Sequence, residues 1–289
     1  MVGADGLVGA SLAALLGQTG ARVTGTTRRA AQESAGVERI DLDLAGEDAA
    51  TVPVAGFSVA YLCAAITSMA ACERDPSRSR SVNVHNTVML AQRLVAAGTR
   101  IVFLSSNTVF DGSRAWPPED APLSPANEYG RQKAAAERAL LSLSTAAAPV
   151  AVVRLSKVMT PSSGMAAEFL GRLAAGMPCP AFDDLRMSPI SLAFATRGLL
   201  AAADSMAEGI FHLSGAQEMS YAEFAGRLAA CIGADPALVR PQSSAASGAP
   251  VLFRPAHPGL GMPRTRERLG IAPEPVAHVM AALAQGTTK

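Results

Sequence analysis

Short runs of apolar and β-branched residues alternate along the first half of the chain with longer segments in which apolar residues recur every three or four positions. The short runs predict buried strands, and the helical period predicts amphipathic helices. The predicted strands are residues 21–26, 37–40, 57–63, 101–104 and 149–155, and the helical patterns include residues 10–20, 79–97 and 129–143. Because the two kinds of element alternate, residues 1–155 are predicted to form an α/β domain with a parallel, doubly wound sheet.

The pattern becomes irregular beyond residue 155, where prolines occur at 161, 178, 180 and 189. Ser220 and Glu223 have the spacing of a capping box, which predicts a helix that runs through Cys231. Other predicted elements are helices at 164–175, 188–203 and 275–285, a strand at 208–214, and a loop at 234–263. We therefore expect residues 156–289 to form mainly a smaller C-terminal lobe, with some segments returning to the sheet.

Composition and charge narrow the class of protein. The chain is 49% hydrophobic, with 25 basic and 24 acidic residues and a net charge of +1, which does not suggest nucleic acid or a membrane surface as a partner. No apolar run reaches membrane-spanning length, and the N-terminus has no signal-peptide pattern. The four cysteines are widely spaced and the four histidines show no ligand spacing, so we expect no metal site and a reducing, cytoplasmic location.

Glycines at positions 3, 6 and 9 stand directly before the first predicted helix. Such a loop lets the backbone approach a pyrophosphate, and the helix N-terminus favours the anion. A strand is expected before a loop of this kind, but only Met1 and Val2 precede it, so this strand is either a stub or begins upstream of this sequence. The loop residues expected to bind a dinucleotide are Gly3, Asp5, Gly6, Leu7, Val8 and Gly9.

The end of the second strand, where such folds distinguish NAD from NADP, carries no carboxylate. It reads Thr27-Arg28-Arg29, and arginine can pair with the 2′-phosphate of NADP, so NADP is favoured and NAD is the alternative. A carboxylate after the third strand can accept from the adenine amino group, and small residues after the fourth leave room for the cofactor. These positions add Asp41, Leu42, Cys63, Ala64 and Ala65 to the candidate cofactor site.

The chemistry is expected in residues 101–133. Ser106 follows the strand at 101–104, and Tyr129 and Lys133 lie four residues apart on one face of the next helix. A tyrosine has a pKa of about 10, and a neighbouring lysine cation lowers it. The phenol could then exchange a proton with a substrate oxygen that the serine also contacts, while a dinucleotide bound at the glycine loop carries the hydride.

Several segments resemble the extended short-chain dehydrogenases/reductases, and most closely the dTDP-4-dehydrorhamnose reductase family, also called RmlD-like sugar-nucleotide-binding proteins. The similarity covers nearly the whole chain. The segments that carry it are GADGLVG (3–9), CAAITSMAACE (63–73), VN (82–83), SSNTVFDG (105–112), YGRQK (129–133), RLSKV (154–158), GIFHLSG (209–215), SYAEFA (220–225) and RPAHPGLGM (254–262).

The resemblance implies a Rossmann-type sheet with a substrate-binding C-terminal lobe, and NADPH as hydride donor to a 4-keto sugar on a nucleoside diphosphate. By position, Ser106 and Tyr129 match the catalytic hydroxyls, and Lys133 matches the lysine that holds the nicotinamide ribose. Arg186 and Arg254 are candidate clamps for an anionic substrate. With Thr67, Asn107, Thr108 and Lys157, they form the predicted substrate site.

Two departures from the family pattern bear on specificity. Asn107-Thr108 replace a usual Asp-Tyr pair, and Lys157 replaces a usual tryptophan. Both changes fall in the expected substrate site, so reductase chemistry is better supported than rhamnose specificity. Two alternatives stay open: a self-recycling epimerase or dehydratase on the same scaffold, and a non-catalytic NADP-binding partner like the regulatory subunit of methionine adenosyltransferase. A homodimer is compatible with either enzyme.

Overall fold

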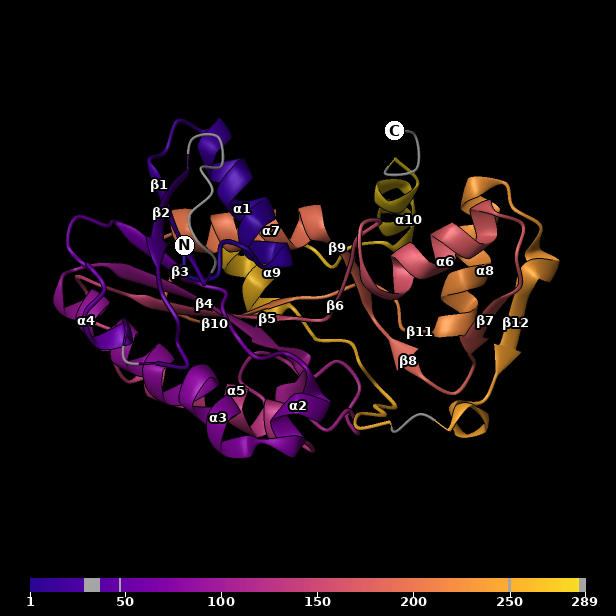
Figure 1. The fold of residues 1–289 in the computed structure, drawn as a ribbon, viewed down its shortest axis with the longest axis horizontal. Coiled ribbons are helices and arrows are strands. Elements are labelled where there is room, and N and C mark those ends of the chain that lie inside the picture. Colours follow the sequence, from indigo (N-terminus) through magenta and orange to yellow (C-terminus); the bar gives the residue numbers. More distant parts are fainter. Residues whose placement is uncertain (29–36, 47, 249–250, 286–289) are drawn as a thin grey trace.

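The central element is a parallel sheet of strand order β10-β5-β4-β3 (Figure 1). The computed structural model describes residues 1–28, 37–46, 48–248 and 251–285 of the chain. The strands of this sheet are β3 (Val59–Leu62), β4 (Arg100–Ser106), β5 (Val150–Leu155) and β10 (Gly209–Leu213). A separate parallel pair joins β1 (Val23–Thr27) to β2 (Val37–Asp41). The predicted strands are therefore present, and β10 is a C-terminal segment that returns to the sheet.

Met1 and Val2 connect the two groups of strands. The Val2 amide donates to Tyr61 O at 2.8 Å and Cys63 N donates to Val2 O at 2.9 Å, while Thr26 N donates to Met1 O at 2.8 Å. These bonds place the first residues of the chain between β3 and β1, in the position of the central strand. The glycine loop therefore starts at the carboxyl end of the sheet, where ligands of doubly wound sheets bind.

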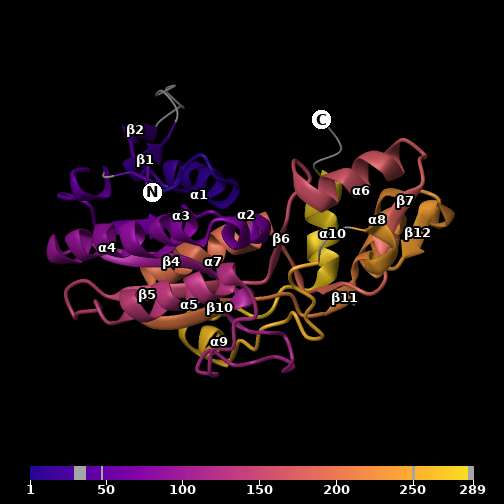
Figure 2. The same ribbon diagram turned by 60° about the horizontal axis from the view of Figure 1, so that its bottom comes forward.

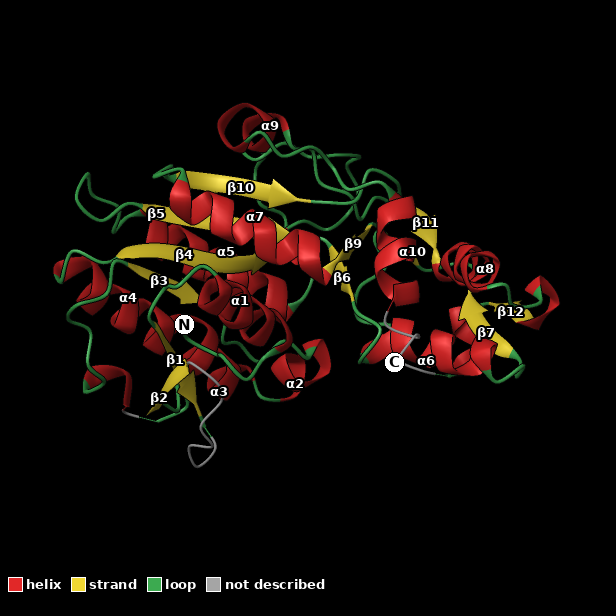
Figure 3. Ribbon diagram, turned by 90° about the horizontal axis from the view of Figure 1, so that it is seen from above, coloured by secondary structure: helices red, strands yellow, loops and turns green. Residues whose placement is uncertain are grey.

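Both faces of the sheet are covered, which confirms the predicted Rossmann-type architecture. Ile101 and Phe103 of β4 belong to one apolar cluster and Val102 to another, because successive side chains of a strand point to opposite faces. The first cluster includes residues of α4 (Thr87–Ala96) and α5 (Glu128–Leu141), and the second includes residues of α1 (Leu7–Gln18) and α7 (Leu192–Asp204). Figure 3 shows these two helix layers on opposite sides of the sheet.

The helix predicted at 79–97 is divided by a π-helical turn. The chain forms α2 (Met69–Arg74), α3 (Pro76–Arg80), the π-helix Ser81–Asn86 and then α4. Thr87 Oγ1 donates to Val82 O at 2.8 Å within this wider turn. π-helical turns are rare and are frequently found at functional sites, and this one places Asn83 in the interior, at 1% exposure.

A second apolar core organises the C-terminal lobe, which Figures 1 and 2 show beside the sheet. Its helices are α6 (Gly164–Ala174), α8 (Tyr221–Ile232) and α10 (Val276–Gln285). Its strands are β7 (Cys179–Phe182) with β12 (Val239–Gln242), and β8 (Arg186–Met187) with β11 (Met219–Ser220). The predicted capping box is confirmed, since Glu223 N donates to Ser220 Oγ at 3.0 Å and Ser220 N to Glu223 Oε2 at 2.6 Å.

Two expectations for this half of the chain were wrong. The segment 188–203 begins with β9 (Pro189–Ser191), which pairs in parallel with β6 (Lys157–Met159), and α7 starts only at Leu192. The predicted loop 234–263 contains β12, and α9 (Pro263–Leu269) follows it. None of the helices in the described ranges is long and apolar enough to cross a membrane.

Candidate active site

The glycine loop is packed so tightly that side chains would not fit. A Cβ on Gly9 would lie 2.1 Å from Gly3 O, and a Cβ on Gly3, which has a φ of 84°, would lie 2.7 Å from Ala64 N. Helix α1 begins at Leu7 with Gly6 as its N-cap and no side-chain cap. The loop therefore lies directly against the small residues that follow β3, with the start of α1 facing the same edge.

Asp5 of this loop is held by Thr27, the last residue of β1, and by Arg39 of β2. Thr27 Oγ1 donates to Asp5 Oδ2 at 2.5 Å, and Arg39 Nη1 lies 2.9 Å from Asp5 Oδ1. Arg39 was not predicted to lie here, because the sequence pattern does not distinguish it from an ordinary exposed residue of its strand. Of the two arginines predicted to select NADP, Arg28 is exposed beside this cluster and Arg29 lies outside the described residues.

The other predicted cofactor contacts follow β2 and β3 at the same edge. Asp41 is exposed, and Leu42 is buried and donates its amide to Thr27 O at 2.9 Å. The three residues after β3 are half-buried: Cys63, Ala64 and Ala65. Burial raises the pKa of the Cys63 thiol to about 12, so this side chain is neutral.

Ser106 ends β4, and its side chain caps the short 3₁₀ turn Asn107–Val109. Its Oγ accepts from Thr108 N at 3.2 Å and from Thr108 Oγ1 at 3.1 Å. Asn107 donates its side-chain amide to Pro258 O at 2.9 Å, and its Oδ1 lies 3.4 Å from Ser106 Oγ. The end of β4 is thereby connected to the C-terminal segment around Pro258.

Tyr129 lies in the first turn of α5, which Asn127 caps by accepting from Gly130 N at 2.8 Å. A Cβ on Gly130 would lie 2.1 Å from Thr108 O, so the start of the helix packs directly on the turn that follows Ser106. Tyr129 is 8% exposed, and no residue in the described part of the chain hydrogen-bonds its phenol. The structure thus leaves this hydroxyl available to a ligand.

The electrostatic coupling of Tyr129 to Lys133 differs from the expectation. Burial raises the pKa of Tyr129, with a smaller contribution from Cys72 in the same direction, so the phenol is neutral. Burial also lowers the pKa of Lys133 to about 8, against the opposing effect of Glu137. The Lys133 ammonium donates to Leu104 O at 2.5 Å and lies 4.1 Å from the centre of the Phe103 ring.

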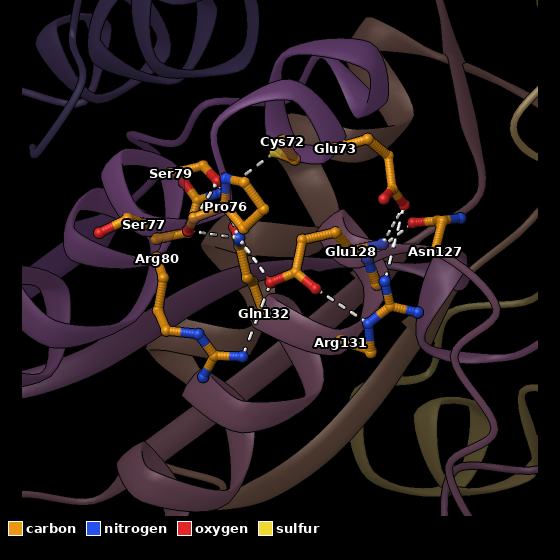
Figure 4. A network of polar contacts seen from close by, with 12 residues as sticks. Cys72, Glu73, Pro76, Ser77, Ser79, Arg80, Asn127, Glu128, Arg131 and Gln132 are labelled. Carbon is orange, nitrogen blue, oxygen red and sulfur yellow. Dashed lines mark hydrogen bonds and ion pairs between the residues drawn. The ribbon is translucent and has the colours of Figure 1, made fainter.

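A buried polar network fixes α5 to the segment before it (Figure 4). Gln132 donates to Glu128 Oε1 at 2.9 Å and to Ser79 Oγ at 2.8 Å, and it accepts from Asn83 at 2.8 Å. Asn83 in turn bonds both backbone groups of Ile66, at 2.8 and 3.0 Å. The loop after β3 and the helix that carries Tyr129 therefore share one set of hydrogen bonds.

A second network lies behind Lys133. Glu137 accepts from Ser105 Oγ and pairs with Arg154, whose Nη2 lies 2.8 Å from Glu137 Oε2. Arg154 Nη1 also lies 3.2 Å from His212 Nε2, and His212 Nδ1 lies 2.7 Å from Gly261 O. Since a guanidinium only donates and a carbonyl only accepts, the proton of the neutral ring is on Nδ1.

Burial and the adjacent Arg154 cation lower the pKa of His212 to about 3. An unfolded histidine has a pKa of about 6.5, so on acidification the unfolded chain takes up this proton first. The contribution of His212 to stability is present above pH 6.5 and is lost as the pH falls toward 3. We expect this group alone to reduce the free energy of unfolding by about 2 kcal/mol between pH 7 and pH 5.

Urea unfolding of the wild type and of His212→Gln at both pH values measures this effect. The variant should be less stable at pH 7 but should lose about 2 kcal/mol less than the wild type on acidification. An equal loss in the two proteins would show that His212 does not titrate on unfolding.

The predicted substrate residues have the following surroundings. Lys157 follows β5 beside the end of β4 and lies 5.9 Å from the Tyr221 ring centre, and Thr67 is exposed. Arg186 donates to Glu218 O at 3.4 Å. Arg254 pairs with Asp184 at 3.1 Å and donates to Ser244 Oγ at 2.5 Å. Hydrogen bonds, first that of the Ser244 amide, lower the pKa of Asp184. Through these two contacts, Arg254 connects the segment before Pro258 to Asp184 and Ser244 of the C-terminal lobe.

Comparison with known proteins gives a family match over nearly the full chain. Residues 1–287 match the family model described as RmlD substrate binding domain. Over 294 residues the chain is 30% identical to a dTDP-4-dehydrorhamnose reductase from Streptomyces griseus, which covers 99% of this chain and 91% of that protein.

Solved structures that share the fold include the following two. MoeE5 in complex with UDP-glucose and NAD has a TM-score of 0.82 at 20% identity, over 99% of this chain and 97% of that one. A dTDP-4-dehydrorhamnose reductase from Bacillus anthracis in complex with NADP has a TM-score of 0.81 at 19% identity, over 100% of this chain and 98% of that one.

Proposed function

Because the chain belongs to the RmlD substrate binding domain family, we propose that it is an oxidoreductase that reduces the 4-keto group of a nucleotide-linked sugar with hydride from NADPH. The observation that carries the proposal is the buried phenol of Tyr129, which has no hydrogen-bond partner among the described residues and belongs to a helix whose Gly130 packs on Thr108, two residues after Ser106. A relative of 30% identity over 99% of the chain bears the name of such a reductase. The same edge of the sheet holds the glycine loop.

The residues at this edge fit a bound dinucleotide. Gly3 and Gly9 form a loop in which any Cβ would collide with backbone, which is the form that lets a pyrophosphate approach main-chain N–H groups. Arg28 supplies positive charge at the end of β1, where a 2′-phosphate would be bound, and the charge of the neighbouring Arg39 is balanced by Asp5. NADP is therefore the favoured cofactor and NAD the alternative, in agreement with the solved relatives that contain one or the other.

NADPH, when bound, supplies the hydride, and the protein's own groups manage the proton and the substrate oxygen. Tyr129 donates its phenolic proton to the oxygen as negative charge develops on it. Ser106 donates a hydrogen bond to the same oxygen, which stabilises that charge. Lys133, protonated at neutral pH, has three donors, of which Leu104 O takes one, and the others can bind a ribose hydroxyl.

The assay that tests this proposal follows NADPH oxidation with a panel of dTDP-, UDP- and GDP-linked 4-keto sugars. We expect oxidation with at least one member, and a lower rate with NADH at equal concentration. A fluorescence titration of NADPH on the same preparation is the control for cofactor binding. Bound NADPH that no panel member oxidises would contradict the reductase and favour an enzyme that recycles its cofactor.

A further inference from the structure

Thr108 controls the hydrogen-bonding state of Ser106. A hydroxyl group has one hydrogen and two acceptor positions. At Ser106 both acceptor positions are filled by the same residue, since Thr108 N donates at 3.2 Å and Thr108 Oγ1 at 3.1 Å. The hydrogen of Ser106 is the only group of this hydroxyl that a ligand can still use.

The remaining neighbour of Ser106 competes only weakly for that hydrogen. Asn107 Oδ1 lies 3.4 Å from Ser106 Oγ, at the outer limit of a hydrogen bond. Asn107 cannot turn closer without breaking the 2.9 Å bond from its amide to Pro258 O. The amide oxygen is also neutral, and a neutral acceptor binds a hydroxyl less strongly than a carboxylate does. A developing alkoxide can therefore take the Ser106 hydrogen from it.

Thr108 also sets the position of Ser106 relative to Tyr129. Its side chain is 3% exposed, which directs the hydroxyl to Ser106 rather than to open space. A Cβ on Gly130 would lie only 2.1 Å from the Thr108 carbonyl oxygen. Gly130, the residue after Tyr129, therefore packs directly on Thr108. Thr108 thus contacts both the Ser106 hydroxyl and the helix residue that follows Tyr129.

We propose that Thr108 is a positioning residue that makes Ser106 an obligate hydrogen-bond donor toward the substrate oxygen. The inference rests on the proposed reductase function. It assigns the Asn107-Thr108 pair of this chain a role in that reaction. It does not require Thr108 to touch the substrate.

The test compares Thr108→Val, which keeps the shape but removes the side-chain donor, with Thr108→Ser, which keeps the donor. We expect Thr108→Val to lower kcat about tenfold, less than the loss of a direct oxyanion donor, with KM for NADPH within about twofold of wild type. Thr108→Ser should restore kcat to within about threefold of wild type. A normal thermal midpoint and NADPH affinity verify that both variants are folded.

A double-variant cycle separates this role from a structural one. In the Ser106→Ala background, Thr108→Val should change kcat by less than about twofold, because the group it orients is absent. A further tenfold loss in that background, or equal activity of Thr108→Val and wild type, would overturn the proposal.

If the wild type were inactive with every sugar, the proposed reductase function would be wrong. A crystal structure of Thr108→Val would still test how Thr108 orients Ser106. In Thr108→Val the new methyl fills the place of the Thr108 hydroxyl, so Ser106 Oγ loses this partner and we expect a second Ser106 rotamer. A single unchanged rotamer without a new partner would overturn the proposal independently of turnover.

Discussion

Replacing Tyr129 with phenylalanine should lower kcat for the keto sugar by about 10²- to 10⁴-fold, the range for loss of a general acid. The phenol has no hydrogen-bond partner among the described residues, and burial raises its pKa, so at neutral pH it carries the proton that the reduced oxygen needs. Phenylalanine fills the same space in the first turn of α5, and no structural bond is lost. The affinity for NADPH, measured by fluorescence titration, should therefore stay within about threefold of wild type.

Tyr61→Phe is the matched control. Tyr61 is also a buried tyrosine whose pKa burial raises, but it belongs to the apolar layer under α1 and α7. Its replacement should leave kcat within about threefold of wild type. Retention of more than a tenth of the wild-type kcat by Tyr129→Phe, or loss of NADPH binding in a folded variant, would remove Tyr129 from the role of proton donor.

Elements with strong local patterns were predictable from sequence. Residues 101–104 and 150–155 are almost continuously apolar because these strands are covered by helices on both faces, and such runs have few alternatives to a buried strand. The glycine loop and the capping box at Ser220 are equally local, since each depends on residues within a few positions. The family resemblance drawn from such motifs was confirmed by the match over residues 1–287.

Features that depend on distant partners were not predictable. The strand β12 lies in a segment rich in Pro and Ser, and it is stabilised by pairing with β7. The local sequence of residues 234–263 does not reveal this partner, because β7 lies more than 50 residues earlier in the chain. Arg39 of β2 reaches Asp5 across β1. The expected lowering of the Tyr129 pKa by Lys133 was inferred from helix spacing, which places two residues on one face but does not measure how deeply they are buried.

Replacing Arg154 with leucine should destabilise the protein by about 3–5 kcal/mol, the cost of leaving one partner of a buried ion pair without the other. Arg154 and Glu137 side chains are each 1% exposed, and three nitrogen–oxygen contacts of 2.8–3.2 Å join them. Among the described residues, leucine would leave the buried Glu137 carboxylate with only the Ser105 hydroxyl as a hydrogen-bond partner. Urea unfolding at pH 7 measures the loss.

The double variant Arg154→Leu/Glu137→Leu separates the charge from the packing. The double variant removes both charges together. It should be more stable than Arg154→Leu alone, because no unpaired charge is left buried. Arg172→Leu is the exposed control: Arg172 and Glu168 are 39% and 62% exposed, and loss of their pair should cost less than about 0.5 kcal/mol. If the double variant were less stable than Arg154→Leu, the Glu137 carboxylate would stabilise the fold even without Arg154. The cost of an unpaired buried charge would then not explain the effect of Arg154→Leu.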